Sequence, residues 1–250
     1  MKKKNRDGEI YCTNEGYLIK VIKYNNANDI IIEFQDEYKA KKKVSIGNIK
    51  KGTIRNPYDK DEFGCCVGET QTVENKKLKK SYTHWYRMTR RVNGKDYKTY
   101  DSVTMCEEWK CYATFEKWFN DNYYELGNEK MELDKDILIK GNKIYSPDTC
   151  IFVPHKINSL FLTSKGNRGK LPIGVGIDKE CPNRPYKASF KAYTNTLLGY
   201  FSTPEEAFNR YKEEKEFYIK KIADEYKNKY PQFPQKIYDA MYNYKIEITD

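Results

Sequence analysis

The stretch from Leu133 to Leu160 constrains the fold of this chain more than any other. An Asp-Lys-Asp triplet and an apolar segment at 137–139 lead into a Gly-Asn turn, and a second apolar segment follows at 151–153. Pro154 then stands where a short helix would begin, because proline is tolerated in the first turn of a helix. This order predicts two strands joined by a turn and followed by a helix, a ββα unit.

The same stretch carries a recognisable residue pattern. It reads Leu133-Asp134-Lys135, then Tyr145-Ser146-Pro147-Asp148-Thr149-Cys150, then an apolar strand and a closing Asn158. This pattern resembles the HNH (ββα-metal) nuclease motif in its phage-encoded branch. The upstream segments that also look like this branch are Trp85–Arg91, Tyr97, and Val103–Trp109 with Phe115–Phe119. The resemblance therefore covers about residues 81 to 163.

The resemblance implies a metal site. Asp134 takes the place of the carboxylate that holds a divalent cation, and Asn158 that of the helix residue that completes the site. Mg²⁺ or Mn²⁺ there would neutralise charge developing on a phosphate. Lys135 replaces the histidine that normally deprotonates the attacking water. With an ordinary pKa of about 10.4, Lys135 would be a base only if desolvated, and would otherwise stabilise phosphate charge.

Two other interpretations of these residues stay open. Asp134, Asp136 and Asn158 are residue types that are common on surfaces, so they could have structural roles alone. The only two histidines, His84 and His155, do not occupy the position that the motif expects. The chain could therefore keep the scaffold without the catalysis.

Composition favours a nucleic-acid partner. The 250 residues include 46 lysines and arginines against 36 acidic residues, a formal charge of +10, with 23 tyrosines. Cations suit phosphates and aromatic rings suit bases, although a solvated basic surface explains the charge equally well. Seven cysteines without a CxxC pair argue against a disulfide framework and against zinc. No apolar run approaches ~18 residues. We expect no membrane contact and a location in the cytoplasm of a bacterial host cell.

Residues 1–58 predict a small antiparallel β-barrel, loosely SH3-like. Alternating or apolar segments at Gly16–Tyr24, Ile30–Phe34 and Val44–Ile49 predict its strands. The lysine run Lys39–Lys43 fits a solvated edge that discourages pairing with another chain. It could also contact phosphate.

The segment 59–80 lacks the apolar periodicity of a helix or strand, and we expect it to be a linker loop. A short amphipathic helix follows at His84–Arg91, with Trp85 and Met88 on its apolar side. Its cationic side consists of Arg87, Arg90 and Arg91. These arginines are candidates for phosphate binding or form a solvated face. A second helix is expected at Cys106–Asn122.

Beyond a polar linker at 164–170 the pattern changes to a sheet and a helix. Three strands are expected at Leu171–Ile177, Tyr186–Tyr193 and Thr196–Phe201. A strong helix start follows, in which Thr203 is the N-cap, Pro204 the first helical residue and Glu206 the partner in a capping box.

This C-terminal part also resembles a known family. Gly174-Val175, Tyr186–Phe190 and Leu198–Ala207 look like the APETALA/ethylene-response-factor DNA-binding domain, over about residues 171 to 226. That resemblance implies a three-stranded sheet in the DNA major groove, backed by one helix. The cations that would face DNA are Lys179, Arg184, Lys187 and Lys191. They could contact guanine edges or phosphates, or merely solubilise an exposed sheet.

Together these patterns predict an α+β protein. It would comprise an N-terminal small antiparallel β-barrel (1–58), a central HNH-like ββα domain with flanking helices (81–163), a C-terminal three-stranded sheet plus helix (165–230) and a tail (231–250). The expected function is that of a phage or mobile-element protein that binds double-stranded DNA and cleaves or nicks it with a divalent metal. The alternatives are a catalytically inactive DNA-binding protein on an HNH scaffold and a phage inhibitor of a host nucleic-acid-binding defence system, for which the partner would be a host protein.

Overall fold

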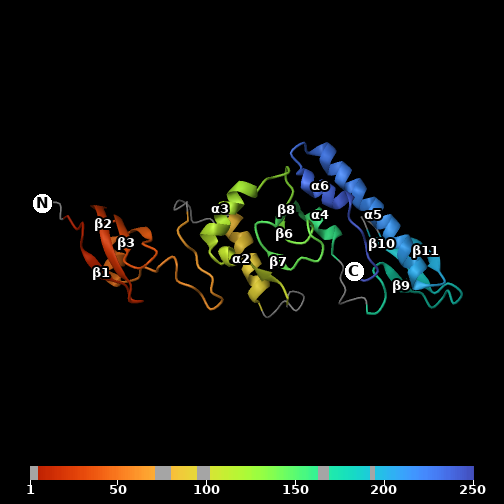
Figure 1. The fold of residues 1–250 in the computed structure, drawn as a ribbon, viewed down its shortest axis with the longest axis horizontal. Coiled ribbons are helices and arrows are strands. Elements are labelled where there is room, and N and C mark those ends of the chain that lie inside the picture. Colours follow the sequence, from red (N-terminus) through yellow and green to blue (C-terminus); the bar gives the residue numbers. More distant parts are fainter. Residues whose placement is uncertain (1–4, 71–79, 95–101, 163–168, 192–194) are drawn as a thin grey trace. The chain divides into compact units, whose positions relative to one another are not determined.

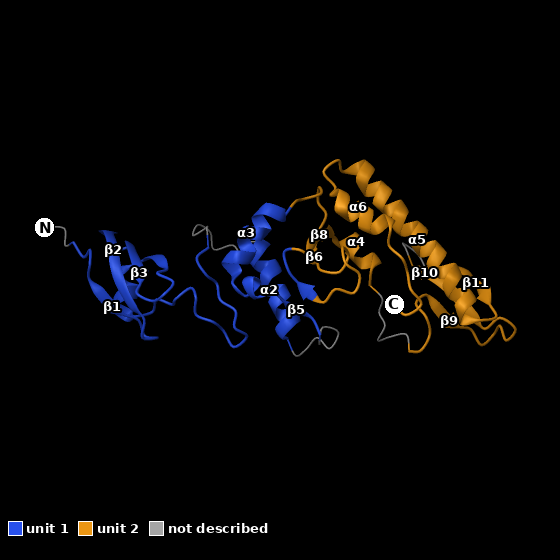
Figure 2. Cartoon of the chain, in the orientation of Figure 1, with its two compact units in different colours: residues 1–123, 144–147 blue, residues 124–143, 148–250 orange. Residues whose placement is uncertain are grey.

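The computed structural model describes residues 5–70, 80–94, 102–162, 169–191 and 195–250 (Figure 1). The fold is mixed α+β. The chain divides into two compact units, residues 1–123 with 144–147 and residues 124–143 with 148–250 (Figure 2). The boundary falls inside the segment 81–163. Tyr97, the second half of the expected linker 59–80 and most of the linker 164–170 lie outside the described residues.

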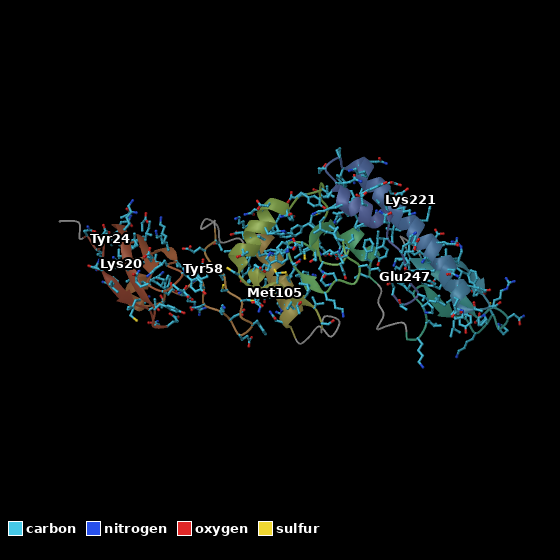
Figure 3. The ribbon with its side chains drawn as sticks, viewed as in Figure 1. Lys20, Tyr24, Tyr58, Met105, Lys221 and Glu247 are labelled. Carbon is cyan, nitrogen blue, oxygen red and sulfur yellow. The ribbon has the colours of Figure 1, made fainter. Side chains whose placement is uncertain are left out.

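The first unit begins with a four-stranded antiparallel sheet in the order β1-β2-β3-β4. Its strands are β1 (Ile10–Cys12), β2 (Leu18–Asn26), β3 (Asp29–Phe34) and β4 (Lys41–Val44). Ile30, Ile32 and Phe34 are fully buried, since alternate residues of a strand point to one face. Lys20 of β2 is exposed (Figure 3). One face of the sheet therefore carries the core.

The sheet is open, so the prediction of a closed barrel was wrong. The segment Val44–Ile49, expected as a strand, leaves the sheet after Val44 and forms helix α1 (Ile46–Lys51). The Ser45 hydroxyl accepts the Asn48 amide at 3.3 Å, and Gly52 ends the helix at a φ of 66°, which glycine adopts without strain. Local capping thus outweighs the strand pattern. Among the described residues no strand joins β4 to β1.

Two helices and a short sheet complete the first unit. Their bounds are α2 (Lys80–Asn93), β5 (Thr104–Met105), the 3₁₀ helix η2 (Glu107–Lys110), α3 (Tyr112–Asn122) and β7 (Ile144–Tyr145), which pairs parallel with β5. Trp85 and Met88 are buried, which confirms the apolar side expected for the first helix. The indole of Trp85 donates to the Trp109 carbonyl at 2.7 Å and so ties α2 to η2.

The second unit contains the expected ββα order, but the apolar segment 137–139 lies in bends that follow the first strand and not in that strand. Strand β6 (Met131–Asp134) pairs antiparallel with β8 (Ile151–Pro154), and α4 (His155–Leu160) follows directly. Met131 and Leu133 are buried. Because side chains alternate along a strand, Glu132 and Asp134 lie together on the opposite face of β6.

The C-terminal sheet and helix also follow the prediction. Strands β9 (Val175–Ile177), β10 (Tyr186–Lys191) and β11 (Asn195–Phe201) form an antiparallel sheet in the order β11-β10-β9. Helix α5 (Pro204–Lys229) begins with the expected capping box, in which Thr203 accepts the Glu206 amide at 3.2 Å. The carboxylate of Glu206 accepts the Thr203 amide in return, also at 3.2 Å.

One hydrophobic core serves the ββα elements and the C-terminal sheet. It includes Val153, Ile157, Phe190 and Ile222, together with Met241 of α6 (Gln235–Tyr242). Residues 231–250 therefore contribute buried side chains to this unit. No helix in the described part of the chain has the length and apolarity needed to cross a membrane.

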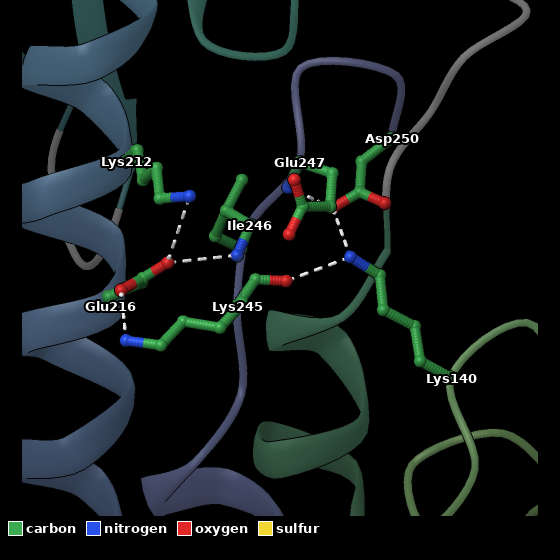
Figure 4. Close-up of polar contacts among 7 residues, drawn as sticks. All are labelled: Lys140, Lys212, Glu216, Lys245, Ile246, Glu247 and Asp250. Atoms are coloured by element: carbon green, nitrogen blue, oxygen red, sulfur yellow. Dashed lines mark hydrogen bonds and ion pairs between the residues drawn. The ribbon is translucent and has the colours of Figure 1, made fainter.

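Two charged side chains fasten the C-terminal segment (Figure 4). Glu216 of α5 accepts the Ile246 amide at 2.9 Å and the Lys245 ammonium at 3.2 Å. Lys140 donates to the Lys245 carbonyl and to the Asp250 carboxylate, both at 2.8 Å. Segments far apart in sequence are thereby joined within this unit.

Candidate functional site

Glu132 is the centre of a polar cluster on the ββα unit. Its Oε2 accepts the side-chain amide of Asn158 at 2.8 Å, and its Oε1 lies 2.9 Å from both His155 Nδ1 and Lys130 Nζ. His155 and Asn158 are three residues apart on α4, which places them on one side of the helix. The ββα geometry thus directs two helix residues at one strand carboxylate.

The electrostatics of this cluster favour an ionised Glu132. Partial burial by itself raises its pKa, but the hydrogen bonds from Asn158, Lys130 and His155 lower it to about 2. The side chain of His155 stays 59% exposed. A carboxylate thus holds one ring nitrogen, and the imidazole remains accessible to solvent.

Asp134 accepts hydrogen bonds from the turn that follows β6. Its Oδ1 accepts the backbone amides of Asp136 at 2.9 Å and Ile137 at 2.7 Å. Burial, followed by the charge of Asp136, raises the Asp134 pKa to about 6, although the two amides and Lys135 act in the opposite direction. The carboxyl group therefore caps the turn that follows β6.

Lys135 is held by its neighbours. Its ammonium lies 3.0 Å from Asp136 Oδ2, and its side chain is only 11% exposed. Its carbonyl accepts the side-chain amide of Asn142 at 2.7 Å. Asp134 therefore ends β6 and accepts amides of the turn in which Lys135 lies, while Asn158 binds Glu132.

Asp134 and Asn158 by themselves offer few of the oxygen ligands that a divalent cation needs. Mg²⁺ prefers about six oxygen ligands in octahedral geometry. Asn158 directs its NH₂ group at Glu132, and one oxygen of Asp134 already accepts two amides. Within the described ranges, no group of three or more His, Cys, Asp or Glu side chains could hold a metal ion.

The Glu132–His155 pair was not anticipated from the sequence. Two signals could have indicated it: the spacing of two in Glu132 and Asp134, which shares a strand face, and the spacing of three in His155 and Asn158. The histidine of an HNH motif is sought on the strand. Here the accessible imidazole comes from the helix.

The C-terminal sheet offers a second candidate surface. Ala188 and Phe190 of β10 are buried in the core that includes α5. Side chains alternate, so Lys187, Ser189 and Lys191 lie on the other face of the strand. Tyr200 pairs with Lys187 and Leu197 with Ser189 across the two strands. We name this set of five residues, Lys187, Ser189, Lys191, Leu197 and Tyr200, the outer sheet face.

An acidic residue moderates the charge of this face. Asp178 Oδ2 lies 3.8 Å from the Lys187 ammonium and accepts the Tyr200 hydroxyl at 3.2 Å. The hydrogen bond to Asp178 and its charge raise the Tyr200 pKa. The Lys187 side chain also passes close to Gly176 of β9: a Cβ added to Gly176 would lie 3.2 Å from Lys187 Cε. Lys187 is therefore positioned rather than freely solvated.

The other three predicted cations of this part are exposed. Lys179 and Arg184 lie in the turn between β9 and β10, and Lys191 lies at the end of β10. None of the three side chains has an ion-pair or hydrogen-bond partner in the part of the chain that the structure describes.

The arginines of α2 lie in the first unit. Arg87 and Arg90 are exposed, and Arg90 lies over the Tyr86 ring, 5.9 Å from its centroid. Arg91 is half-buried and donates to the Tyr145 hydroxyl at 3.5 Å, so it contributes to packing. Of the three predicted arginines of α2, Arg87 and Arg90 are therefore the exposed ones.

No protein-family model matches this sequence, and neither a curated protein nor a solved structure matches it. The two resemblances therefore rest on residue patterns alone.

Proposed function

We propose that the protein binds double-stranded DNA through the outer sheet face and the β9–β10 turn. The observation that carries the proposal is the division of the C-terminal sheet. One face is buried in the core that includes α5, whereas the other, with its turn, holds the cations Lys179, Arg184, Lys187 and Lys191. Arginine and lysine donate to phosphate oxygens and to guanine O6 and N7. A three-stranded sheet with one helix behind it, and a chain charge of +10, fit this role.

Binding without metal chemistry is the part of this function that the geometry supports best. Asp134, Lys135 and Asn158 are occupied by contacts within the ββα unit. The unit would then serve as scaffold for the sheet, with which it shares a core.

The test uses the full chain and a labelled duplex, with anisotropy measured over a range of salt. Replacing Arg184 and Lys191 by Gln should weaken binding about tenfold and flatten the salt slope by about 1–2. The matched control replaces Lys221 of α5 (Figure 3) and Lys236 of α6 by Gln, since both are exposed and lie outside this surface. Equal binding by both double variants, or no salt-sensitive binding by the parent, would contradict the proposal. The latter result would favour a protein partner.

A second candidate function is DNA cleavage, and the Glu132–His155 pair favours it. An exposed imidazole held by a carboxylate is the arrangement of a general base that could deprotonate an attacking water. Supercoiled plasmid with Mg²⁺ or Mn²⁺, and with EDTA as control, tests it. Nicking that disappears in both His155→Gln and Glu132→Gln would support this role. Nicking that survives both substitutions would exclude this role for the Glu132–His155 pair. A parent protein that does not nick the plasmid would exclude cleavage as the function.

A further inference from the structure

A cavity of about 800 Å³ lies beside the edge strand β4 in the first unit. Its basic lining residues are Lys41, Lys42, Lys43, Arg55 and Lys60. Small-molecule sites in proteins typically measure about 300–1,000 Å³. We name this hollow the basic cavity. Its size and charge suit a small anionic group.

Three of these cations have no carboxylate partner among the described residues. Lys41 is 3.9 Å from Glu33, and Lys43 is 3.3 Å from Asp29. Lys42 instead donates to the Arg55 carbonyl at 3.1 Å. The Arg55 guanidinium and the Lys60 ammonium have no ion-pair or hydrogen-bond partner in the described ranges. Lys42, Arg55 and Lys60 therefore retain charge that a ligand could neutralise.

Lys42 differs from the other two in where its side chain begins. It pairs with the buried Ile32 across β3 and β4, so its side chain starts on the core face of the sheet. Burial lowers its pKa. An anion beside this ammonium would favour its charged form and so oppose the effect of burial.

The acidic residues of the basic cavity are mostly engaged. They are Glu15, Asp59, Asp61 and Glu69. Asp59 accepts the Tyr17 hydroxyl, Asp61 accepts two backbone amides at 2.8 and 2.9 Å, and Glu69 accepts the Lys41 amide. Three of the four carboxylates thus have donors within the protein.

Edge protection accounts for only part of this cluster. Lysines on an edge strand discourage pairing with another chain, which explains Lys41 and Lys43. Arg55 and Lys60 lie after helix α1, outside any strand. Edge protection therefore does not explain why Arg55 and Lys60 line the same cavity as the lysines of β4.

We propose that the basic cavity binds the phosphate ester of a nucleotide. The nucleotide could be free or part of a nucleic-acid strand. The planar guanidinium group of Arg55 would donate two hydrogen bonds to two phosphate oxygens. The ammonium groups of Lys42 and Lys60 would supply further positive charge. This site lies in the other compact unit from the outer sheet face, so the proposal does not depend on duplex binding there.

The test measures anisotropy of the full chain with two probes, fluorescently labelled ATP and a labelled single-stranded oligothymidylate. Replacing Arg55 and Lys60 by Gln should weaken binding of at least one probe about tenfold. The matched control replaces Lys50 and Lys51 by Gln. These two are exposed residues of α1 that do not line the basic cavity, and the charge change is the same. The melting temperatures of both variants establish that they fold.

The two probes distinguish the sources of the phosphate. Binding of labelled ATP that inorganic phosphate displaces indicates a free nucleotide, and binding of the oligothymidylate alone indicates a strand. Failure of the parent to bind either probe would overturn the proposal. Equal affinity in the two double variants would overturn it as well. The Arg184/Lys191 variant should still bind the probe, which separates this site from the outer sheet face.

Discussion

Asn158 of α4 donates its side-chain hydrogen bond to Glu132 of β6, over 2.8 Å, and not to Asp134. Glu132 also lies 2.9 Å from His155 and Lys130. The polar link between helix and strand in this ββα unit therefore runs through the residue two positions before the expected carboxylate. Its strength can be measured.

Glu132→Gln should destabilise the protein by about 1–2 kcal/mol at pH 7, because charged hydrogen bonds from three donors are weakened. The Glu132 pKa of about 2 lies below its ordinary value of 4.5. The stabilisation is therefore present above pH 4.5 and is lost as the pH falls towards 2. Urea unfolding at several pH values should show a flatter dependence in this window for the variant. Glu180→Gln, at an exposed turn residue, is the control. If the unfolding free energy of Glu132→Gln depended on pH in the same way as that of the parent, the hydrogen bonds around Glu132 would have no role in stability.

Asp134→Asn should have the opposite effect. The folded-state pKa of Asp134, about 6, lies above its ordinary value of 3.8. Below pH 3.8 both states are protonated. Between pH 3.8 and 6 the unfolded chain ionises first, so stability falls as the pH rises.

An asparagine oxygen at position 134 can accept the same two backbone amides without carrying charge. We expect unfolding free energy at pH 7 to rise by about 1–3 kcal/mol, and the gain to vanish near pH 4. Asp121→Asn, at an exposed carboxyl of α3, should change little. A loss of stability at pH 7 in Asp134→Asn would show that the ionised carboxylate itself is required.

The contrast between these residues shows what the sequence could predict. The order of strand, turn, strand and helix followed from apolar periodicity and from Pro154. The partner of Asn158 did not, because register across β6 and β8 and the direction of α4 decide which carboxylate it meets. A residue pattern identifies the unit but not its hydrogen bonds.

The contrast between local and long-range interactions also explains which other elements could be predicted from the sequence. The capping box at Thr203 and Glu206 is local, so the start of α5 was predictable. The path after Val44 depends on a competition between strand pairing and the Ser45 cap, and the apolar pattern of Val44–Ile49 fits both. The burial of Met241 and Ile246 depends on packing with distant elements, for which the sequence carries only a weak amphipathic signal.

Gly174→Ala should destabilise the C-terminal sheet severely. Gly174 has a φ of 78°, and a Cβ there would lie 2.0 Å from Tyr211 Cδ2. Left-handed strain and overpacking together should cost about 2–5 kcal/mol. Gly169→Ala is the matched control, because its φ is 66° and no atom lies within 4 Å of the added Cβ. Chemical denaturation that gave equal losses for both variants would show that Tyr211 moves aside freely.

Asp178→Asn should strengthen duplex DNA binding. Asp178 is 3.8 Å from the Lys187 ammonium and accepts the Tyr200 hydroxyl, so its charge offsets that of the outer sheet face. An asparagine oxygen can still accept the Glu180 amide, which Asp178 now accepts at 3.1 Å, and the turn should be retained. Without this negative charge, Lys187 becomes available to a phosphate. Binding should therefore tighten several-fold at low salt, and the slope of log K against log salt concentration should steepen by up to about 1. Anisotropy titrations against the parent measure this, with Asp121→Asn in the other unit carrying the same charge change. Unchanged or weaker binding by a normally folded Asp178→Asn variant would mean that Lys187 does not face the DNA.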